Sequence, residues 1–235
     1  MTDTRVSPSI DGRVFSGEQI NGFEDDPVIR QLREITDSAR RSLEDCYKAK
    51  DAHVSNPLLT EASALVKTAN YADKRRGEIL PKFDNALATV KREVEQLEAE
   101  LNAPLRTNTD ANDTLSQREV REYVRGLPKK QRLEFLTNAA QAGDTDALRA
   151  VLGARPYLSG LTEPEWKGAR HTYHKTHRGE DLRRLEALRH ASETLHRTAH
   201  IYMKGIMSVV PAKTVNEIRQ KAAAADRALR EGDTA

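Results

Sequence analysis

The chain has 235 residues, of which 37% are hydrophobic, 31% charged and 5% aromatic, and its net charge is +2. The hydrophobic fraction is below the roughly 45 to 50% typical of globular domains, which argues against a thick sandwich or a doubly wound sheet. The single cysteine, Cys46, excludes an intramolecular disulfide, and no apolar run approaches the roughly 18 residues of a membrane span. We therefore expect an all-α protein of slender helices with narrow apolar stripes and no membrane contact.

Residues 1–25 are predicted to form an extended N-terminal arm. Pro8 and three glycines interrupt this segment, and its apolar residues are scattered. Two interpretations stay open. The arm is disordered, or the spaced Phe15, Ile20 and Phe23 are anchors that become ordered on a neighbouring subunit.

Residues 26–102 are predicted to form an elongated helical hairpin or bundle. Asp26 and Pro27 suit the N-cap and the first position of a helix whose apolar residues recur every three or four positions. A second helical region begins at Thr60. We expect Pro81 to kink this region or divide it in two, because proline lacks a backbone donor and clashes one turn back.

The helix after Pro81 carries the clearest pattern in the chain, a heptad seam with 4-3-4-3-4 spacing that is typical of coiled coils. Its residues are Phe83, Leu87, Val90, Val94, Leu97 and Leu101. Such a seam must be covered by another helix, from this chain or from a copy of it. The seam is shorter than roughly three to four heptads, and a similar stripe runs from Val28 to Cys46, so we favour burial in an intramolecular hairpin.

Residues 103–115 are polar and lack an apolar period, which predicts a linker, and residues 116–235 are predicted to form a C-terminal helical domain. Capping boxes at Ser116–Glu119 and Thr162–Glu165 each predict the start of a helix. Between them, glycines close a cluster of short helices at about 117–126, 128–142 and 145–152. Long helices follow the second capping box, one ending near Pro211 and the last covering about 212–231.

The C-terminal domain is mildly basic, with 22 basic against 15 acidic side chains. Such a surface can face phosphate groups or an acidic protein. The candidate contacts are Arg183, Arg184, Arg189 and Arg197. The short helices have the spacing of a small helix-turn-helix, but none concentrates Arg, Asn and Gln on one exposed face, so we do not favour sequence-specific DNA reading.

The same domain holds six of the seven histidines: His171, His174, His177, His190, His196 and His200. The last two are four residues apart and could share one metal ion, but no third ligand is evident and there is no HExxH motif. Solvated or interfacial histidines are the simpler interpretation, with a pH-sensitive contact as another. The sequence also lacks a Gly-rich phosphate loop and a Ser-His-Asp order, so we expect no cofactor, no metal and no enzymatic activity.

Two stretches, LRAVLGARPYLSGLT and YHKTHRGEDLRRLEALRHA, resemble uncharacterised helical proteins encoded in the virion gene clusters of tailed bacteriophages and prophages. The resemblance covers about residues 26–205 and transfers no functional residue. It implies a component of the head, the connector or the particle interior, assembled in the host cytoplasm, whose partners are other virion proteins or copies of itself. We therefore predict a non-enzymatic structural or assembly protein. The alternative is a nucleic-acid-binding accessory protein.

Overall fold

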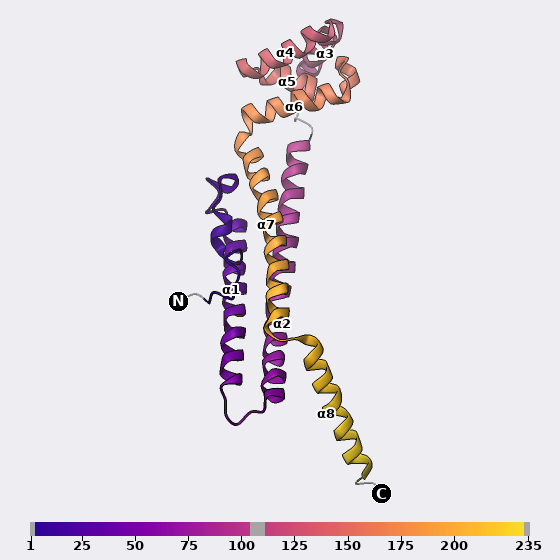
Figure 1. Cartoon of the computed structure of the whole chain (residues 1–235). Helices are drawn as coiled ribbons and strands as arrows, with labels where there is room; N and C mark the ends of the chain where they lie inside the picture. Colours follow the sequence, from indigo (N-terminus) through magenta and orange to yellow (C-terminus); the bar gives the residue numbers. More distant parts are fainter. Residues whose placement is uncertain (1–2, 104–110, 233–235) are drawn as a thin grey trace. The chain divides into compact units, whose positions relative to one another are not determined.

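The computed structural model describes residues 3–103 and 111–232 of the chain (Figure 1). Within these residues the structure has eight α-helices and three short 3-10 helices, and no strand. The predicted all-α class is confirmed.

The chain divides into two compact units. Unit 1 consists of Met1–Glu93 and Ala187–Ala235, and unit 2 is Val94–Glu186. Unit 2 is thus inserted between the two parts of unit 1, and helices α2 and α7 contribute residues to both. This division differs from the predicted boundary at 103–115, because α7 returns to pack on the N-terminal helices instead of joining a separate C-terminal core. Residues 104–110 of the predicted linker lie outside the described residues.

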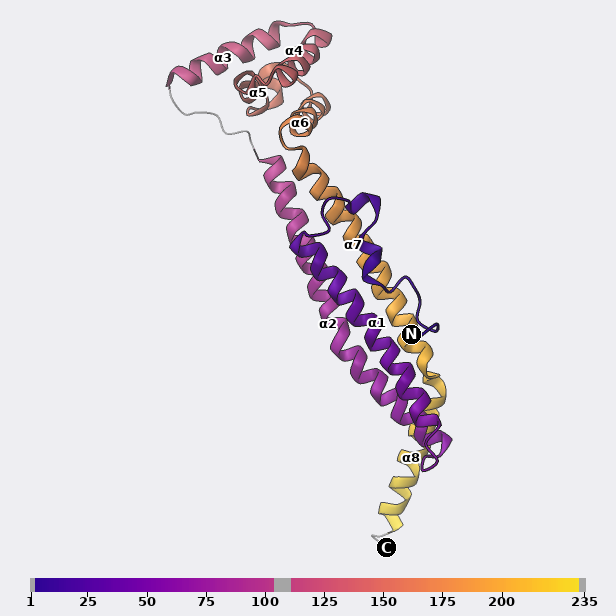
Figure 2. The same ribbon diagram turned by 90° about the vertical axis from the view of Figure 1, so that its left-hand side faces the viewer.

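Unit 1 is built on three helices that run side by side (Figures 1 and 2): α1 (Pro27–Val54), α2 (Glu61–Asn102) and α7 (Gly179–Val209), the last two only in part. As predicted, α1 begins with Asp26 as N-cap, whose side chain accepts hydrogen bonds from two backbone N–H groups, and with proline in its first turn.

Tyr202 of α7 lies at the centre of this bundle and is fully buried. Its hydroxyl shares a 3.1 Å hydrogen bond with Ser42 Oγ of α1 and donates to the carbonyl of Arg75 in α2 at 3.4 Å. Its ring lies 5.9 Å from the ring of Phe83, also in α2. One side chain therefore contacts all three helices.

Helix α2 is continuous through Pro81, so the predicted division of this region into two helices is wrong. An internal proline costs a helix roughly 3 kcal/mol. Here Ile79, Phe83 and Ala86 are buried on both sides of the exposed Pro81, so packing of the flanking turns opposes that cost.

The segment before α1 is folded onto its own chain and is not an extended arm. It contains two 3-10 helices, η1 (Gly12–Phe15) and η2 (Glu18–Ile20). The Gly12 N–H donates to Asp37 of α1 at 2.7 Å. The buried apolar residues of the segment are Val6, Ile10, Phe15 and Ile20. Burial of these side chains removes apolar surface from water and so favours the folded segment.

Unit 2 contains the cluster of short helices: α3 (Ala111–Gly126), α4 (Lys129–Ala142), α5 (Thr145–Leu152), the 3-10 helix η3 (Pro156–Ser159) and α6 (Glu163–His177). Two predicted boundaries are confirmed: Gly143 ends α4 with a positive φ of 73°, and Thr162 with Glu165 forms a capping box at the start of α6. Helix α3 begins earlier than predicted, so Ser116–Glu119 lies inside it. The core of these helices includes Val124, Leu136, Leu148, Val151, Leu152 and Leu161.

The last helix, α8 (Ala212–Gly232), belongs to unit 1 and contacts α2 through its first turns. Val215 is only 2% exposed. Arg219 donates to Asn70 Oδ1 of α2 at 2.6 Å and lies 3.7 Å from Asp73.

Candidate interaction surfaces

The heptad seam of α2 is covered within the chain. Phe83, Val90, Leu97 and Leu101 are buried, and Leu87 and Val94 are partly buried. In unit 1 the Phe83 ring meets Tyr202, and in unit 2 the residues from Val94 to Leu101 pack with Leu182 and Leu185. Helix α7 therefore takes part in covering the seam in both units, whereas the sequence had suggested only the stripe of α1 as its cover. The buried part of the seam is therefore not available to a partner.

The three predicted arm anchors are also occupied within the chain. Phe15 and Ile20 are fully buried, and Phe23 is partly buried. The segment is further held by Arg40 of α1, which forms an ion pair of 2.8 Å with Asp11. These contacts attach the segment to α1 of its own chain.

The four candidate phosphate contacts all lie on α7, which crosses the boundary between the two units. Arg183 and Arg184 belong to unit 2, whereas Arg189 and Arg197 belong to unit 1. Arg197 donates to Thr194 Oγ1 on the preceding turn at 3.1 Å. The four arginines that were predicted together thus belong to two different units.

The histidines were considered above as metal ligands. Within residues 3–103 and 111–232, no three side chains of His, Cys, Asp or Glu are placed so that they could hold a metal ion. His196 and His200 are exposed on α7, and His174 is buried on α6. Cys46 is buried as well, and burial raises the pKa of its thiol to about 11, which makes it a poor nucleophile at neutral pH.

Arg170 of α6 forms the most connected polar site of unit 2, and the sequence analysis missed it. Its guanidinium is buried and donates to the carbonyl of Leu101 at 2.7 Å and to the carbonyl of Ala103. It also donates to Nε2 of His174 at 3.2 Å and lies 4.8 Å from the centre of the Trp166 ring. Arg170 thereby attaches α6 to the C-terminal end of α2, where backbone carbonyls lack helical partners and favour a cation.

A sequence signal for this site exists. Trp166, Arg170 and His174 are spaced four residues apart, so they share one face of a helix. An arginine between two aromatic side chains on one helix face indicates a stacked, partly buried cation. The acceptor carbonyls on α2 could not be anticipated, because they are 67 and 69 residues away in the sequence.

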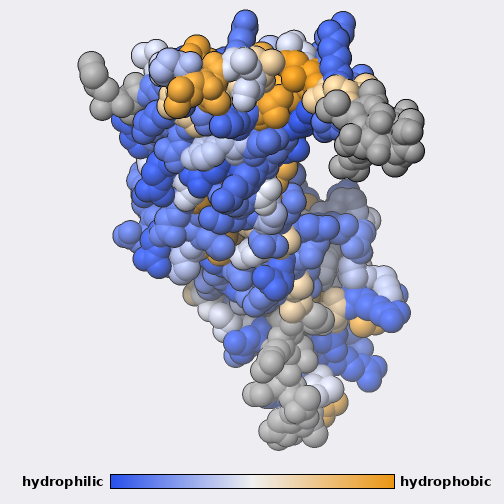
Figure 3. Space-filling model, turned by 90° about the horizontal axis from the view of Figure 1, so that it is seen from below, coloured by the Kyte–Doolittle hydropathy of each residue, from blue (hydrophilic) through white to orange (hydrophobic). Residues whose placement is uncertain are grey.

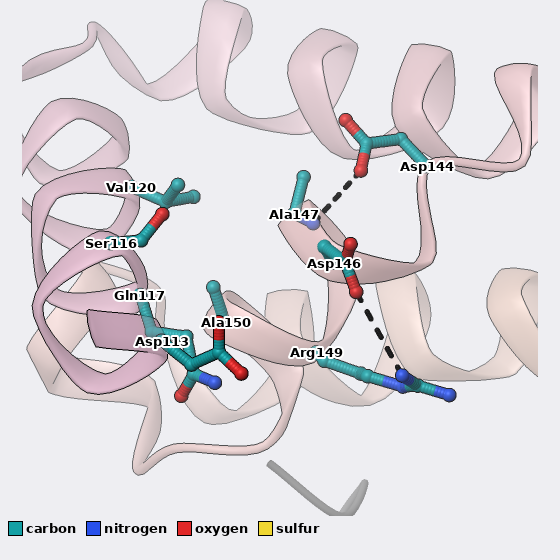
Figure 4. A pocket seen from close by; sticks show the side chains of 9 residues that line it. All are labelled: Asp113, Ser116, Gln117, Val120, Asp144, Asp146, Ala147, Arg149 and Ala150. Atoms are coloured by element: carbon teal, nitrogen blue, oxygen red, sulfur yellow. Dashed lines mark hydrogen bonds and ion pairs between the residues drawn. The ribbon is translucent and has the colours of Figure 1, made fainter. Parts of the chain in front are cut away.

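A cavity of about 410 Å³ lies between α3 and α5 in unit 2 (Figure 4). Three aspartates line it, but two of them already have partners. Asp144 accepts a hydrogen bond from the Ala147 N–H at 3.0 Å and so caps α5, and Asp146 lies 3.8 Å from Arg149. Asp113, on α3, is the third. The cavity is therefore a surface hollow beside a helix start, and its carboxylates do not define a ligand site.

Exposed apolar side chains mark one end of the unit 1 bundle. Leu58 is 90% exposed, Val54 67% and Met207 61%. Figure 3 shows apolar patches at this end, over the connection between α1 and α2 and over the junction of α7 and α8. A groove of about 230 Å³ runs beside this junction, with the apolar lining residues Ala69, Ala72, Ile206, Met207, Val210 and Val215. Exposed apolar surface of this kind is typical of protein contacts.

Together the fold and these surfaces define a helical bundle protein with an inserted helical unit, whose polar contacts join its own helices. The chain matches no protein-family model, no curated protein and no solved structure. None of the described helices has both the length and the apolar character that crossing a membrane requires.

Proposed function

We propose that the protein is a non-enzymatic structural or assembly component of a phage-like virion, and that it acts by packing a helix against other virion proteins or copies of itself. The resemblance of residues 26–205 to proteins of virion gene clusters supports the biological setting. The observation that carries the proposal is α8, a helix whose apolar stripe continues past its last contact with the rest of the chain.

Helix α8 has 21 residues, but only its first turns pack on the bundle. Val215 is buried and Ile218 is partly buried, whereas residues 219–227 are all exposed. Isolated helices of roughly 12 to 15 residues are only marginally stable in water. A partner along this part of α8 would stabilise it, and a structural protein supplies such partners in the assembled particle.

The partner contact would therefore lie elsewhere than on the two surfaces predicted from the sequence, the seam of α2 and the N-terminal segment. The buried seam residues of α2 and the apolar residues of the N-terminal segment are already covered by this chain. The remaining candidates are α8 and the apolar end of the unit 1 bundle.

The test is the composition of purified particles. The gene is tagged in a host that produces the particles, and the protein is quantified by mass spectrometry after density-gradient purification. We expect the protein in a fixed ratio to the major particle protein, and we expect deletion of residues 212–235 to remove it. Normal expression with no protein in the particles would contradict the proposal.

The salt dependence of binding distinguishes the nucleic-acid alternative from assembly through helix packing. Phosphate contacts release counterions, so binding to DNA should fall steeply between low and physiological salt and weaken when Arg189 and Arg197 are replaced. Assembly through apolar helix faces should depend little on salt. Because residues 220–227 of α8 are all exposed, we favour assembly.

A further inference from the structure

A cavity of about 250 Å³ lies in unit 1, between the N-terminal segment and α7. Its polar lining residues are Ser9, His190, Thr194, Arg197 and Thr198. Each of these side chains carries an N–H or O–H donor, and no carboxylate is among the described side chains that line the cavity. A hollow that combines a cation with several donors and no acid suits an anion.

The lining residues of α7 occupy positions at which a packed helix normally carries apolar side chains. His190, Thr194, Arg197 and Ile201 follow a 4-3-4 spacing, as the seam residues of α2 do. Only the last of the four is apolar. Polar residues at the packing positions of a helix weaken the fold, and they are expected where a function requires them.

Arg197 is held at the cavity by a buried hydroxyl. Its Nη2 donates to Oγ1 of Thr194 at 3.1 Å, and Thr194 is only 6% exposed. Because a guanidinium is a donor only, Thr194 accepts this bond and keeps its own O–H for another acceptor. A guanidinium fork beside a free hydroxyl proton is a donor set that matches the oxygens of a phosphate group.

The acids that lie nearest in the sequence do not occupy the cavity. Asp11, which lies between two lining residues of the N-terminal segment, forms ion pairs of 2.9 Å with Arg13 and 2.8 Å with Arg40. Glu193 is exposed on α7 and does not line the cavity. Among the described residues, no carboxylate forms an ion pair with Arg197, so its charge is available to a ligand.

We propose that this cavity binds one phosphate group, as inorganic phosphate or as the end of a small phosphomonoester. Arg197 supplies the charge, and Ser9, His190 and Thr194 supply further donors. The cavity is smaller than the roughly 300 to 1,000 Å³ of sites for larger ligands, so it fits a single small group. Since its walls come from the N-terminal segment and α7, the ligand would join these two parts of unit 1. The inference is independent of the proposed function, because it uses neither α8 nor the apolar end of the bundle.

The first experiment is calorimetric titration of the full chain with inorganic phosphate and with methyl phosphate, at constant ionic strength. We expect one site per chain. Arg197→Gln should weaken binding about tenfold or more, because it removes the charged donor. Lys204→Gln is the matched control: it removes a positive charge from an exposed position of α7 outside the cavity and should bind like the wild type.

Two results of this titration would overturn the site. One is failure of the wild-type chain to bind either probe at millimolar concentration. The other is an equal loss of binding in Arg197→Gln and Lys204→Gln, which would show a general attraction to a positive surface.

The second experiment tests the role of Thr194 in positioning Arg197. Thr194→Val keeps the shape of the side chain but removes the hydroxyl, and should weaken phosphate binding, whereas Thr194→Ser keeps the hydroxyl and should retain it. Phosphate should also slow hydrogen exchange in residues 9–15 of the wild-type chain and have no such effect in Arg197→Gln. Slowing of exchange that persists in Arg197→Gln would place the ligand elsewhere.

Further probes separate the two sources of a phosphate group. A phosphomonoester carries up to two negative charges and three strong acceptor oxygens. Dimethyl phosphate, which has the diester of a nucleic-acid backbone, has fewer of both and should bind more weakly than methyl phosphate. If a single-stranded oligonucleotide bound through Arg197 while methyl phosphate did not bind, the proposal would be overturned in favour of the nucleic-acid alternative.

Discussion

Tyr202 shows how a single buried polar residue can join three helices. Its hydroxyl is held by groups on α1 and α2, and burial raises its pKa to about 12, so it stays protonated in the bundle. A residue of this kind stabilises the fold through its ring and also selects one packing arrangement through its hydroxyl.

Tyr202→Phe should lower the free energy of unfolding by about 1–2 kcal/mol, because the ring is kept but Ser42 and the Arg75 carbonyl lose a buried partner. Urea unfolding followed by circular dichroism measures the change. Tyr123→Phe is the control, because Tyr123 is mostly exposed and should be nearly neutral. Equal effects of the two substitutions would contradict the central role of Tyr202.

The Arg170 site predicts a dependence of stability on pH. Burial lowers the pKa of His174 below its ordinary value of 6.5, and the charges of Arg170, Arg178 and His171 lower it further. As the pH falls below about 6.5, the unfolded chain therefore takes up a proton that the folded chain does not. The stability that neutral His174 contributes is present above this pH and is lost as the pH falls toward the folded-state pKa.

Urea unfolding at pH 7.5 and pH 5, followed by the fluorescence of Trp166, measures this effect. Trp166 is the only tryptophan and lies beside Arg170, so it reports on the site. His174→Gln should weaken the pH dependence. His196→Gln, at an exposed position on α7, should leave it as in the wild type. A His174→Gln chain that responds to pH like the wild type would show that other groups are responsible.

At the scale of the elements, the close approach of α1 and α7 depends on a glycine. A Cβ at Gly205 of α7 would lie 2.5 Å from Cδ2 of Leu43, which is buried in α1 and has little room to move. In α2, by contrast, a Cβ at Gly77 would meet nothing within 4 Å. Two glycines in long helices of the same unit therefore have opposite roles.

We expect Gly205→Ala to destabilise the protein by about 1–3 kcal/mol, because the added methyl overfills the contact with Leu43. Gly77→Ala should stabilise it by about 0.5–1 kcal/mol, because alanine has the higher helix propensity and no contact opposes it. Thermal and urea unfolding of both variants test the pair. Stabilisation by both would show that the helix contact at Gly205 is loose.

At the scale of the whole molecule, the heptad seam of α2 contributes buried residues to both units. Val90 belongs to unit 1 and is fully buried there, and Leu97 belongs to unit 2 and packs with Leu101 and Leu185. Because the two halves of the seam belong to different units, a defect in each half should affect its own unit first.

Val90→Asp should cost about 3 kcal/mol or more and should reduce hydrogen-exchange protection in α1 and in the unit 1 part of α7. Leu97→Asp should reduce protection at the end of α2 and the start of α7 in unit 2. Ala88→Asp, at an exposed position of α2, is the control and should change little. Loss of protection across the entire chain in both variants would show that the two units unfold together.

Features set by neighbouring residues were predicted well. The start of α1 at Asp26 and Pro27, the end of α4 at Gly143 and the capping box of Thr162 and Glu165 all depend on residues within about four positions of one another. The division expected at Pro81 was wrong, because the local cost of a proline is visible in the sequence and the burial of the surrounding turns is not.

The amino-acid sequence by itself thus determined the all-α class, most helix boundaries and the presence of a buried seam on α2, since these follow from caps and apolar periodicity. Only the tertiary structure decided that α7 takes part in covering the seam, that residues 94–186 form an inserted unit and that Arg170 binds the end of α2. The physical reason is that any helix whose apolar residues have a matching spacing can bury an apolar stripe. Which helix does so depends on how the whole chain packs.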